Sequence, residues 1–287
     1  MTPFDLREPD SLQEAISLLD PEDPTTRAIA GGTALMLMMK AGVFQPGRLV
    51  SLRKVSRQYS QIASADGEIR LGAMATLSDL AHSPIVRREL PVVADALPML
   101  SNVRVRNVAT LGGQLAHADP HTDLPPILIA LGARIVAAGP DGERTIPAEE
   151  LVSGYYATVL AGNELITDVR LPAQGSRRAS YLKWTTRSAD DWPALGVAIV
   201  LDVDGNLIRD ARVVVSAATD RPVRLTAAED ALRGVPLDEA LLRRAGEAAG
   251  EQVDPVSDAR GSADYKRQLV RVSIGRGIRQ CMAEGPS

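Results

Sequence analysis

Hydrophobic positions in the first part of the chain alternate between short extended runs and helical stretches with one apolar face. In residues 11–19, Leu12, Ala15 and Ile16 lie on the same side of a helix, and Pro21 ends the pattern. The predicted elements, in chain order, are a strand at 3–7, a helix at 11–19, a strand at 27–30, a helix at 33–41 and a strand at 48–52. This alternation favours a small α/β unit.

A different pattern begins after residue 60. Residues 61–65 and 68–72 flank Asp66-Gly67, which is typical of a β-hairpin closed by a type I′ turn and predicts an antiparallel sheet. The later elements are predicted to be helices at 76–82 and 85–97 and strands at 134–138, 144–146 and 164–171. Residues 173–178, with a glycine, a serine and paired arginines, are predicted to be a linker.

Beyond the linker, the pattern predicts a second domain. It consists of strands at 179–187, 194–203 and 211–218, followed by helices at 224–233, 237–250 and 262–282. A three-stranded antiparallel sheet covered by helices is an α+β arrangement. We therefore expect an N-terminal domain at residues 1–175, with subdomains at about 1–55 and 56–175, and a C-terminal domain at 176–287.

Composition narrows the class of protein. The chain has 287 residues, of which 3% are aromatic, and its net charge of −4 argues against a nucleic-acid-binding surface. The most apolar runs, at 28–39 and 125–138, are too short to span a bilayer, and the N-terminus lacks the pattern of a secretory signal. We expect a cytoplasmic protein that binds no nucleic acid and has no membrane span.

Cysteine and histidine positions bear on disulfides and metal sites. The only cysteine is Cys281, so the chain forms no internal disulfide and by itself ligates neither a four-cysteine zinc site nor an iron–sulfur cluster. His117 and His121 are spaced as two ligands on one helix face would be, but Pro120 disfavours a continuous helix across them. We predict no metal site.

Two glycine pairs are the main candidates for a binding site. Gly31-Gly32 and Gly112-Gly113 each follow an apolar stretch and precede a helix start or hydrogen-bonding side chains. Glycine lets the main chain approach a ligand closely, and helix N-termini favour phosphates, so the pairs are candidates for gripping the two phosphates of a dinucleotide. The alternative is two unrelated turns. No GxGxxG or Walker pattern supports a Rossmann or P-loop interpretation.

The sequence shows no acid–base machinery of its own. It contains no GxSxG motif, no cysteine–histidine pair with an evident orienting group and no distinctive carboxylate pair, so we predict no catalytic side chain. The basic residues of the last predicted helix are interpreted as a solvated face, with a subunit contact as the alternative. They are Lys266, Arg267, Arg271, Arg276 and Arg279.

Several segments together resemble a known family. AGGTALMLMMK at residues 30–40 and NVATLGGQLAHADPHTDLPPILIALGA at 107–133 are similar to the two flavin-binding signatures of the FAD-binding medium subunit of molybdenum hydroxylases, the carbon monoxide dehydrogenase and xanthine dehydrogenase group. Residues 154–167, 181–199 and 262–272 extend the resemblance over almost the whole chain. The resemblance implies the vanillyl-alcohol-oxidase and CO-dehydrogenase flavoprotein fold, with a two-part FAD-binding domain and a smaller C-terminal domain.

The resemblance also implies which residues bind the cofactor. The first pyrophosphate loop would be Ala30, Gly31, Gly32, Thr33 and Ala34, and the second Thr110, Leu111, Gly112, Gly113 and Gln114. Asp123 would contact FAD, Ile166 or its neighbour Leu165 would make an apolar contact, and Lys183 would lie near the flavin. Ala34, Gln114 and Tyr156 depart from the residues common at these positions in the family.

The implied function is electron transfer. Electrons would leave a substrate at a molybdenum cofactor, pass through [2Fe–2S] clusters on a partner chain and reach non-covalent FAD here, before leaving for NAD, a quinone or oxygen. The implied assembly is a dimer of heterotrimers with an iron–sulfur subunit and a molybdenum subunit. The alternatives are a self-contained FAD-dependent oxidoreductase of related fold and a nucleotide-binding module without flavin.

Overall fold

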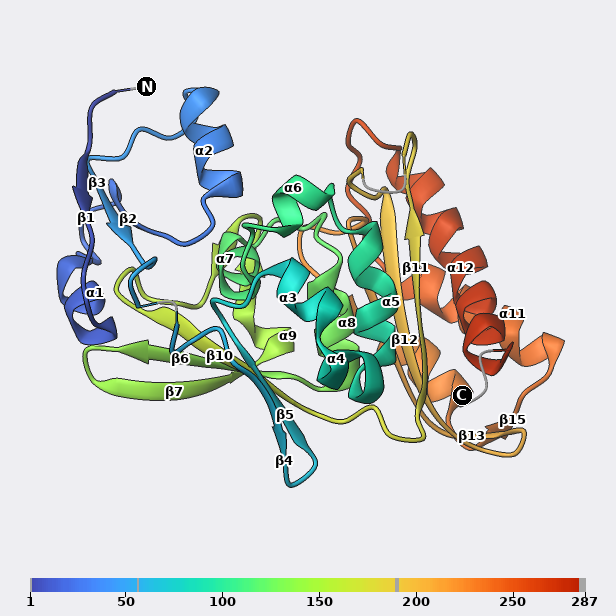
Figure 1. Ribbon diagram of the computed structural model, residues 1–287. Coiled ribbons are helices and arrows are strands. Elements are labelled where there is room, and N and C mark those ends of the chain that lie inside the picture. Colours follow the sequence, from blue (N-terminus) through green and yellow to red (C-terminus); the bar gives the residue numbers. More distant parts are fainter. Residues whose placement is uncertain (1, 56, 189–190, 284–287) are drawn as a thin grey trace.

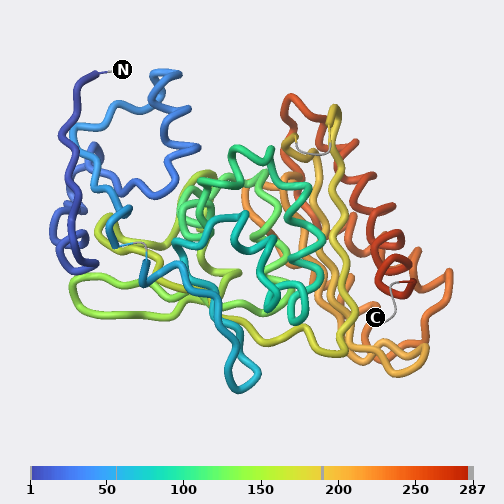
Figure 2. The backbone as a smooth tube through the Cα atoms, in the orientation of Figure 1, coloured from blue at the N-terminus to red at the C-terminus, as the bar shows by residue number. Residues whose placement is uncertain are grey.

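The computed structural model describes residues 2–55, 57–188 and 191–283. The chain passes through a small N-terminal unit and a central unit to a C-terminal sheet with long helices on its outer face (Figure 1). The first and last elements, β1 (Asp5–Arg7) and α12 (Ala263–Ala283), lie at opposite ends of the molecule, as the path of the chain in Figure 2 shows.

The N-terminal unit confirms the predicted α/β arrangement. Its parallel strands lie in the order β1-β3-β2, with β2 at Thr26–Ile29 and β3 at Arg48–Ser51. Helix α1 (Leu12–Leu18) begins where the Ser11 hydroxyl accepts a hydrogen bond from the Glu14 N–H, and it buries Ala15 and Ile16. Helix α2 (Thr33–Lys40) starts after Gly32.

An antiparallel sheet forms the base of the central unit. Its strands lie in the order β4 (Ile62–Ala65), β5 (Glu68–Gly72), β10 (Leu165–Pro172), β6 (Arg134–Gly139) and β7 (Gly142–Pro147). The predicted hairpin is confirmed, and the φ angles of Asp66 and Gly67, 51° and 75°, are those of a type I′ turn. A separate two-stranded sheet contains β8 (Val152–Gly154) and β9 (Ala157–Thr158).

Short helices complete the central unit. They are α3 (Leu77–His82), α4 (Pro84–Glu89), α5 (Pro91–Ala96), the 3-10 helix η1 (Leu97–Met99), α6 (Val103–Arg106), α7 (Leu111–His117), α8 (Leu124–Leu131) and α9 (Ala148–Leu151). The prediction of one helix at 85–97 was wrong. Pro91 cannot donate a backbone hydrogen bond, and Leu90 before it takes φ −135° and ψ 55°, which ends α4 and lets α5 begin anew.

The C-terminal sheet is antiparallel and contains the three predicted strands. These are β11 (Arg178–Trp184), β12 (Leu195–Asp204) and β13 (Leu207–Ser216). The sheet also includes two strands that are too short to leave a recognisable alternation, β14 (Val223–Arg224) and β15 (Val235–Pro236), both paired with β13. Its helices are α10 (Thr226–Leu232), α11 (Glu239–Gln252) and α12.

The two faces of this sheet belong to different cores. One set of side chains, including Val213 and Val215, packs against the outer helices. The alternate positions, including Val200 and Val214, pack in one cluster with the residues of α8. Every residue of α8 is buried, so this helix joins the central unit to the C-terminal sheet.

The connection at residues 173–178 is packed against the central unit. The N–H of Gln174 donates to the Glu89 carbonyl at 2.8 Å, and its side-chain oxygen accepts from the N–H of Val92 at 3.3 Å. Within the described ranges, no helix combines the length and apolar character needed to cross a bilayer.

Candidate functional site

The first glycine pair lies between β2 and α2. Gly32 is the N-cap of α2 in the left-handed region, with φ 69°, and supplies no side-chain cap. Among the described residues, the first N–H groups of this helix, those of Thr33, Ala34 and Leu35, have no hydrogen-bond acceptor. They can therefore hold an anion at the positive end of the helix dipole.

The second glycine pair forms the first turn of α7 rather than a loop. The N–H groups of Leu111 and Gly112 donate to the carbonyls of Ala75 and Ala73, at 3.0 and 2.7 Å. The Gly113 N–H donates to the Thr110 hydroxyl at 3.2 Å. These backbone donors are satisfied within the protein, so they differ from the donors of α2. A Cβ on Gly112 would lie 2.7 Å from the Cβ of Ala73, so packing within the protein accounts for this glycine.

The two glycine segments lie against each other. An ideal Cβ on Gly31 would be 1.9 Å from the carbonyl oxygen of Val108, and one on Gly113 would be 3.8 Å from the Cβ of Ala30. Close by in sequence, the side-chain oxygen of Gln114 is buried without a hydrogen-bond partner among the described residues. An unsatisfied buried acceptor is costly, so a ligand that donates to Gln114 would complete this site.

Asp123 and Lys183 are brought together across the domain junction. The Lys183 ammonium donates to Asp123 Oδ2 at 3.1 Å and to the Met99 carbonyl at 2.7 Å, and the two side chains are 3% and 7% exposed. The Tyr181 hydroxyl donates to Asp123 Oδ1 at 2.6 Å. Burial raises the pKa of Asp123, opposed by Lys183 and by the hydrogen bond from Tyr181, and burial also raises the pKa of Tyr181.

Asp123 does not cap helix α8 with its side chain. It occupies the N-cap position of α8, but its side chain makes no capping hydrogen bond, because both oxygens are engaged by β11. Tyr181 and the Met99 carbonyl were missed by sequence reasoning. The only signal for Tyr181 was its position two residues before Lys183, on the same face of a strand.

Ile166 and Leu165 face different cores. Leu165 is buried in the small N-terminal cluster, whereas Ile166 is half-buried and packs against the central one. Strand β10 changes register between Ile166 and Asp168, a bulge that alters the direction of neighbouring side chains.

No metal cluster is evident at this site. In the part of the chain that the structure describes, no three histidine, cysteine, aspartate or glutamate residues are grouped as metal ligands. The predicted metal-like pair is separated by the end of α7: His117 is in that helix, and Ala118 after it takes φ 51°.

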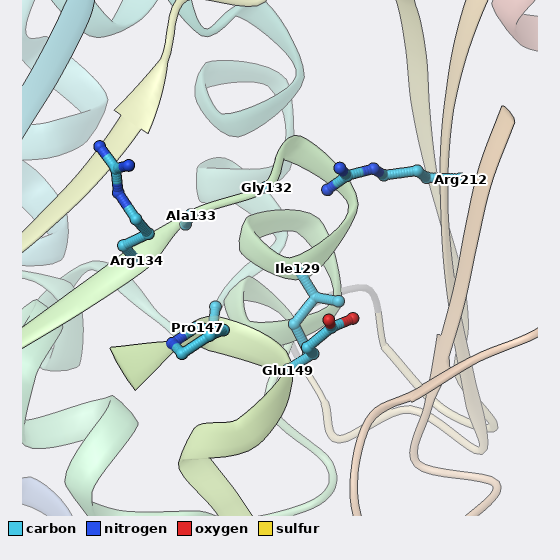
Figure 3. A pocket seen from close by; sticks show the side chains of 8 residues that line it. Ile129, Gly132, Ala133, Arg134, Pro147, Glu149 and Arg212 are labelled. Atoms are coloured by element: carbon cyan, nitrogen blue, oxygen red, sulfur yellow. The ribbon is translucent and has the colours of Figure 1, made fainter. Parts of the chain in front are cut away.

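A separate pocket of about 190 Å³ lies at the other end of α8. Figure 3 shows Arg212 reaching from β13 towards Gly132, with Glu149 and Pro147 nearby. Glu149 is paired with Arg224 at 3.2 Å, and Arg134 on the pocket wall is paired with Glu68. None of the residues predicted to bind a cofactor lines this pocket.

The fold and site together define a cofactor-binding protein of the α+β class, in which a helix N-terminus is held beside a second glycine segment. Two family models match the chain: the FAD-binding domain in molybdopterin dehydrogenase over residues 2–174, and the CO dehydrogenase flavoprotein C-terminal domain over residues 180–281.

Individual relatives match over nearly their full length. The carbon monoxide dehydrogenase medium chain of Hydrogenophaga pseudoflava is 31% identical, covering 98% of this chain and 97% of the relative. The nicotine 6-hydroxylase medium subunit of Paenarthrobacter nicotinovorans is 34% identical, covering 94% of each. A structure of carbon monoxide dehydrogenase from Hydrogenophaga pseudoflava, lacking the Mo-pyranopterin moiety of its cofactor, is 33% identical, with a TM-score of 0.95 over 100% of both chains.

The chain therefore belongs to the family of FAD-binding medium subunits of molybdenum hydroxylases. Its fold is the CO-dehydrogenase flavoprotein fold that the resemblance implied, and it is a subunit of an oxidoreductase.

Proposed function

We propose that this subunit binds FAD non-covalently and carries electrons from iron–sulfur clusters on a partner chain to an external acceptor. FAD supplies the ability to accept electrons and to release them singly or in pairs, while the protein binds and orients it. The observation that carries the proposal is the start of α2, whose first N–H groups have no acceptor among the described residues and lie beside the second glycine segment.

The residues present fit this cofactor. We assign the pyrophosphate to the first segment, Ala30, Gly31, Gly32, Thr33 and Ala34, where backbone N–H groups are available. In the second segment, Thr110, Leu111, Gly112 and Gly113 form the supporting helix start, and Gln114 offers the buried acceptor. We assign Ile166 to an apolar contact and the Asp123–Lys183 pair to the wall of the site nearest the C-terminal domain.

The single cysteine supports a complex in which another chain carries the iron–sulfur clusters. Cys281 is buried in the C-terminal core, so this chain alone cannot ligate a [2Fe–2S] cluster. The relatives are named medium chains or medium subunits. We propose partners of two kinds, an iron–sulfur subunit and a molybdenum-cofactor subunit, assembled as a dimer of heterotrimers in the cytoplasm, with NAD, a quinone or oxygen as acceptor.

We also propose that the functional division follows the expected domains. Residues 1–55 and 56–175 would together hold FAD, and residues 176–287 would close the site from the other side. The ranges of the two family models, 2–174 and 180–281, support a boundary in this region.

FAD should be released intact by acid. The first glycine segment holds its ligand with backbone groups, which form hydrogen bonds but no covalent tether. Acid precipitation of the yellow protein should therefore leave all of the flavin in the supernatant, measured by absorbance and fluorescence. Flavin remaining with the pellet would point to attachment at a nearby side chain such as His117 or His121.

The chain should co-purify with an iron–sulfur chain and a molybdenum chain when all are expressed together. A chemical reductant should still reduce the flavin of the isolated subunit. Because this chain lacks cluster ligands of its own, however, the isolated subunit should not oxidise the substrate of the complex. Affinity purification followed by metal analysis tests this. Substrate turnover by the isolated chain, without iron or molybdenum, would favour the self-contained flavoenzyme instead.

A further inference from the structure

A network of hydrogen-bonded side chains crosses the domain junction at His121. Its Nδ1 lies 3.1 Å from Asp119 Oδ1 on the same loop, and its Nε2 lies 3.2 Å from Asp258 Oδ2 in the C-terminal domain. The His121 side chain is 11% exposed, and Asp258 is 137 residues away along the chain. One imidazole ring therefore bridges carboxylates of two domains.

Both carboxylates are ionised. Burial acts to raise the pKa of Asp258, but hydrogen bonds from Lys266, from the Arg260 N–H and from His121 lower it to about 2. Burial also acts to raise the pKa of Asp119, but the net pKa is lowered because Asp119 accepts hydrogen bonds from the side chain and backbone of His121. The two ring nitrogens of His121 face these carboxylates from opposite sides, so the ring holds a carboxylate of each domain in place.

The partner carboxylate is itself held rigidly. The Lys266 ammonium donates to Asp258 Oδ2 at 2.8 Å and to the Ala217 carbonyl at 3.0 Å, and its side chain is 1% exposed. Asp119, His121, Asp258 and Lys266 therefore form one connected network across the domain junction. Loss of the His121 ring would leave Asp119 and Asp258 without the side chain that joins them, which is costly for partly buried polar groups.

The backbone next to this network also joins the domains. The Ala217 N–H donates to the Pro120 carbonyl at 2.9 Å, and Ala217 takes φ 64°, a left-handed conformation that is unfavourable for a residue with a side chain. Strain of this kind persists where surrounding contacts hold it. Pro120, Asp119 and His121 are the same short segment between α7 and α8.

The same loop also leads into the candidate cofactor site. It begins after α7, the helix of the second glycine segment, and ends at Asp123, which binds Tyr181 and Lys183 on β11. The loop thus contacts the C-terminal domain at three points: Pro120 with Ala217, His121 with Asp258, and Asp123 with β11. Separated contacts constrain the orientation of one domain against another, which one contact cannot do.

We propose that His121 is a positioning residue: by bridging Asp119 and Asp258 it fixes the C-terminal domain against the α7–α8 loop and so places Lys183 against Asp123 at the flavin site. The charged and titratable groups around it are Asp119 and His117 on its own side, Tyr156 from the β8–β9 turn, and Asp258, Arg260 and Lys266 from the C-terminal domain. Trp192 covers the ring, with centroids 6.4 Å apart.

The first test measures FAD affinity, and it rests on the proposed function because FAD is the probe. His121→Gln should bind FAD about tenfold more weakly than the wild type, because an amide cannot replace the two opposed ring nitrogens that reach Asp119 and Asp258. The matched control is His82→Gln, because His82 is exposed and hydrogen-bonds within its own helix.

The second test is independent of the cofactor. A double-mutant cycle with His121→Gln and Asp258→Asn, measured by urea denaturation of FAD-free chain, should show that the two substitutions are strongly non-additive. Such coupling supports the lock even if the wild type bound no FAD, in which case only the proposed cofactor would be wrong. Additive effects, or wild-type FAD affinity in His121→Gln, would overturn it.

Discussion

Replacing Gly31 with alanine should weaken FAD binding by roughly a hundredfold. The new Cβ would lie 1.9 Å from the Val108 carbonyl oxygen and 2.7 Å from its carbon, and both are backbone atoms that no rotamer change can move. One of the two glycine segments must therefore shift. Because Gly31 leads directly into Gly32 and the N-terminus of α2, the shift separates the free N–H groups from Gln114. Fluorescence titration with FAD measures the loss.

The control for this substitution is Gly154→Ala. A Cβ on Gly154 would meet nothing within 4 Å, and its backbone does not require glycine. It should bind FAD as the wild type does. If Gly31→Ala also kept wild-type affinity, the close packing of the two segments would not be what shapes the site. The circular dichroism of both variants should retain the signal of the C-terminal sheet, whose outer face packs in a separate core with the long helices.

Local patterns predicted most of the fold because they are set by neighbours in sequence. The Asp66-Gly67 turn and the amphipathic helix after residue 11 were both predicted, since each depends on a few consecutive residues. Pro91 marks the break between α4 and α5 in the sequence, but the apolar periodicity on either side of it led to the prediction of one continuous helix. The strands β14 and β15 have no pattern because two residues cannot show alternation.

The geometry of the site depended on contacts that no local pattern encodes. The N–H groups of Leu111 and Gly112 donate to the carbonyls of Ala75 and Ala73, and the second glycine pair forms a helix start instead of a loop. Likewise, Asp123 was expected to contact FAD, and the hydrogen bond that it accepts from Tyr181 comes from a strand 58 residues away. Glycine spacing indicated where a ligand could approach, while tertiary pairing decided which donors remained available.

Lys183→Met should destabilise the chain by about 3–5 kcal/mol, the usual cost of removing one partner of a buried ion pair. Methionine fills similar space, so the loss comes mainly from charge: Asp123 would keep the hydrogen bond from Tyr181 but lose the ammonium at 3.1 Å. The Met99 carbonyl would also lose its donor. Urea denaturation measures the change. Adding Asp123→Asn should recover much of the stability, because the remaining buried group would be neutral, whereas no recovery would mean that Lys183 acts through packing alone.

The pH dependence of the stability of Lys183→Met tests the same ion pair through the ionisation of Asp123. Burial raises the pKa of Asp123 above its ordinary value of 3.8, so the folded chain holds this proton more tightly than the unfolded chain does. The contribution of Asp123 to stability is therefore fully present below that value and is lost as the pH rises through the folded-state pKa. Without Lys183 to favour the charged form, that pKa should rise further, and the stability of Lys183→Met should fall more steeply towards neutral pH than that of the wild type. A parallel slope in both proteins would mean that Lys183 does not hold Asp123 in its ionised form, and the pair would then have no electrostatic role at the flavin site.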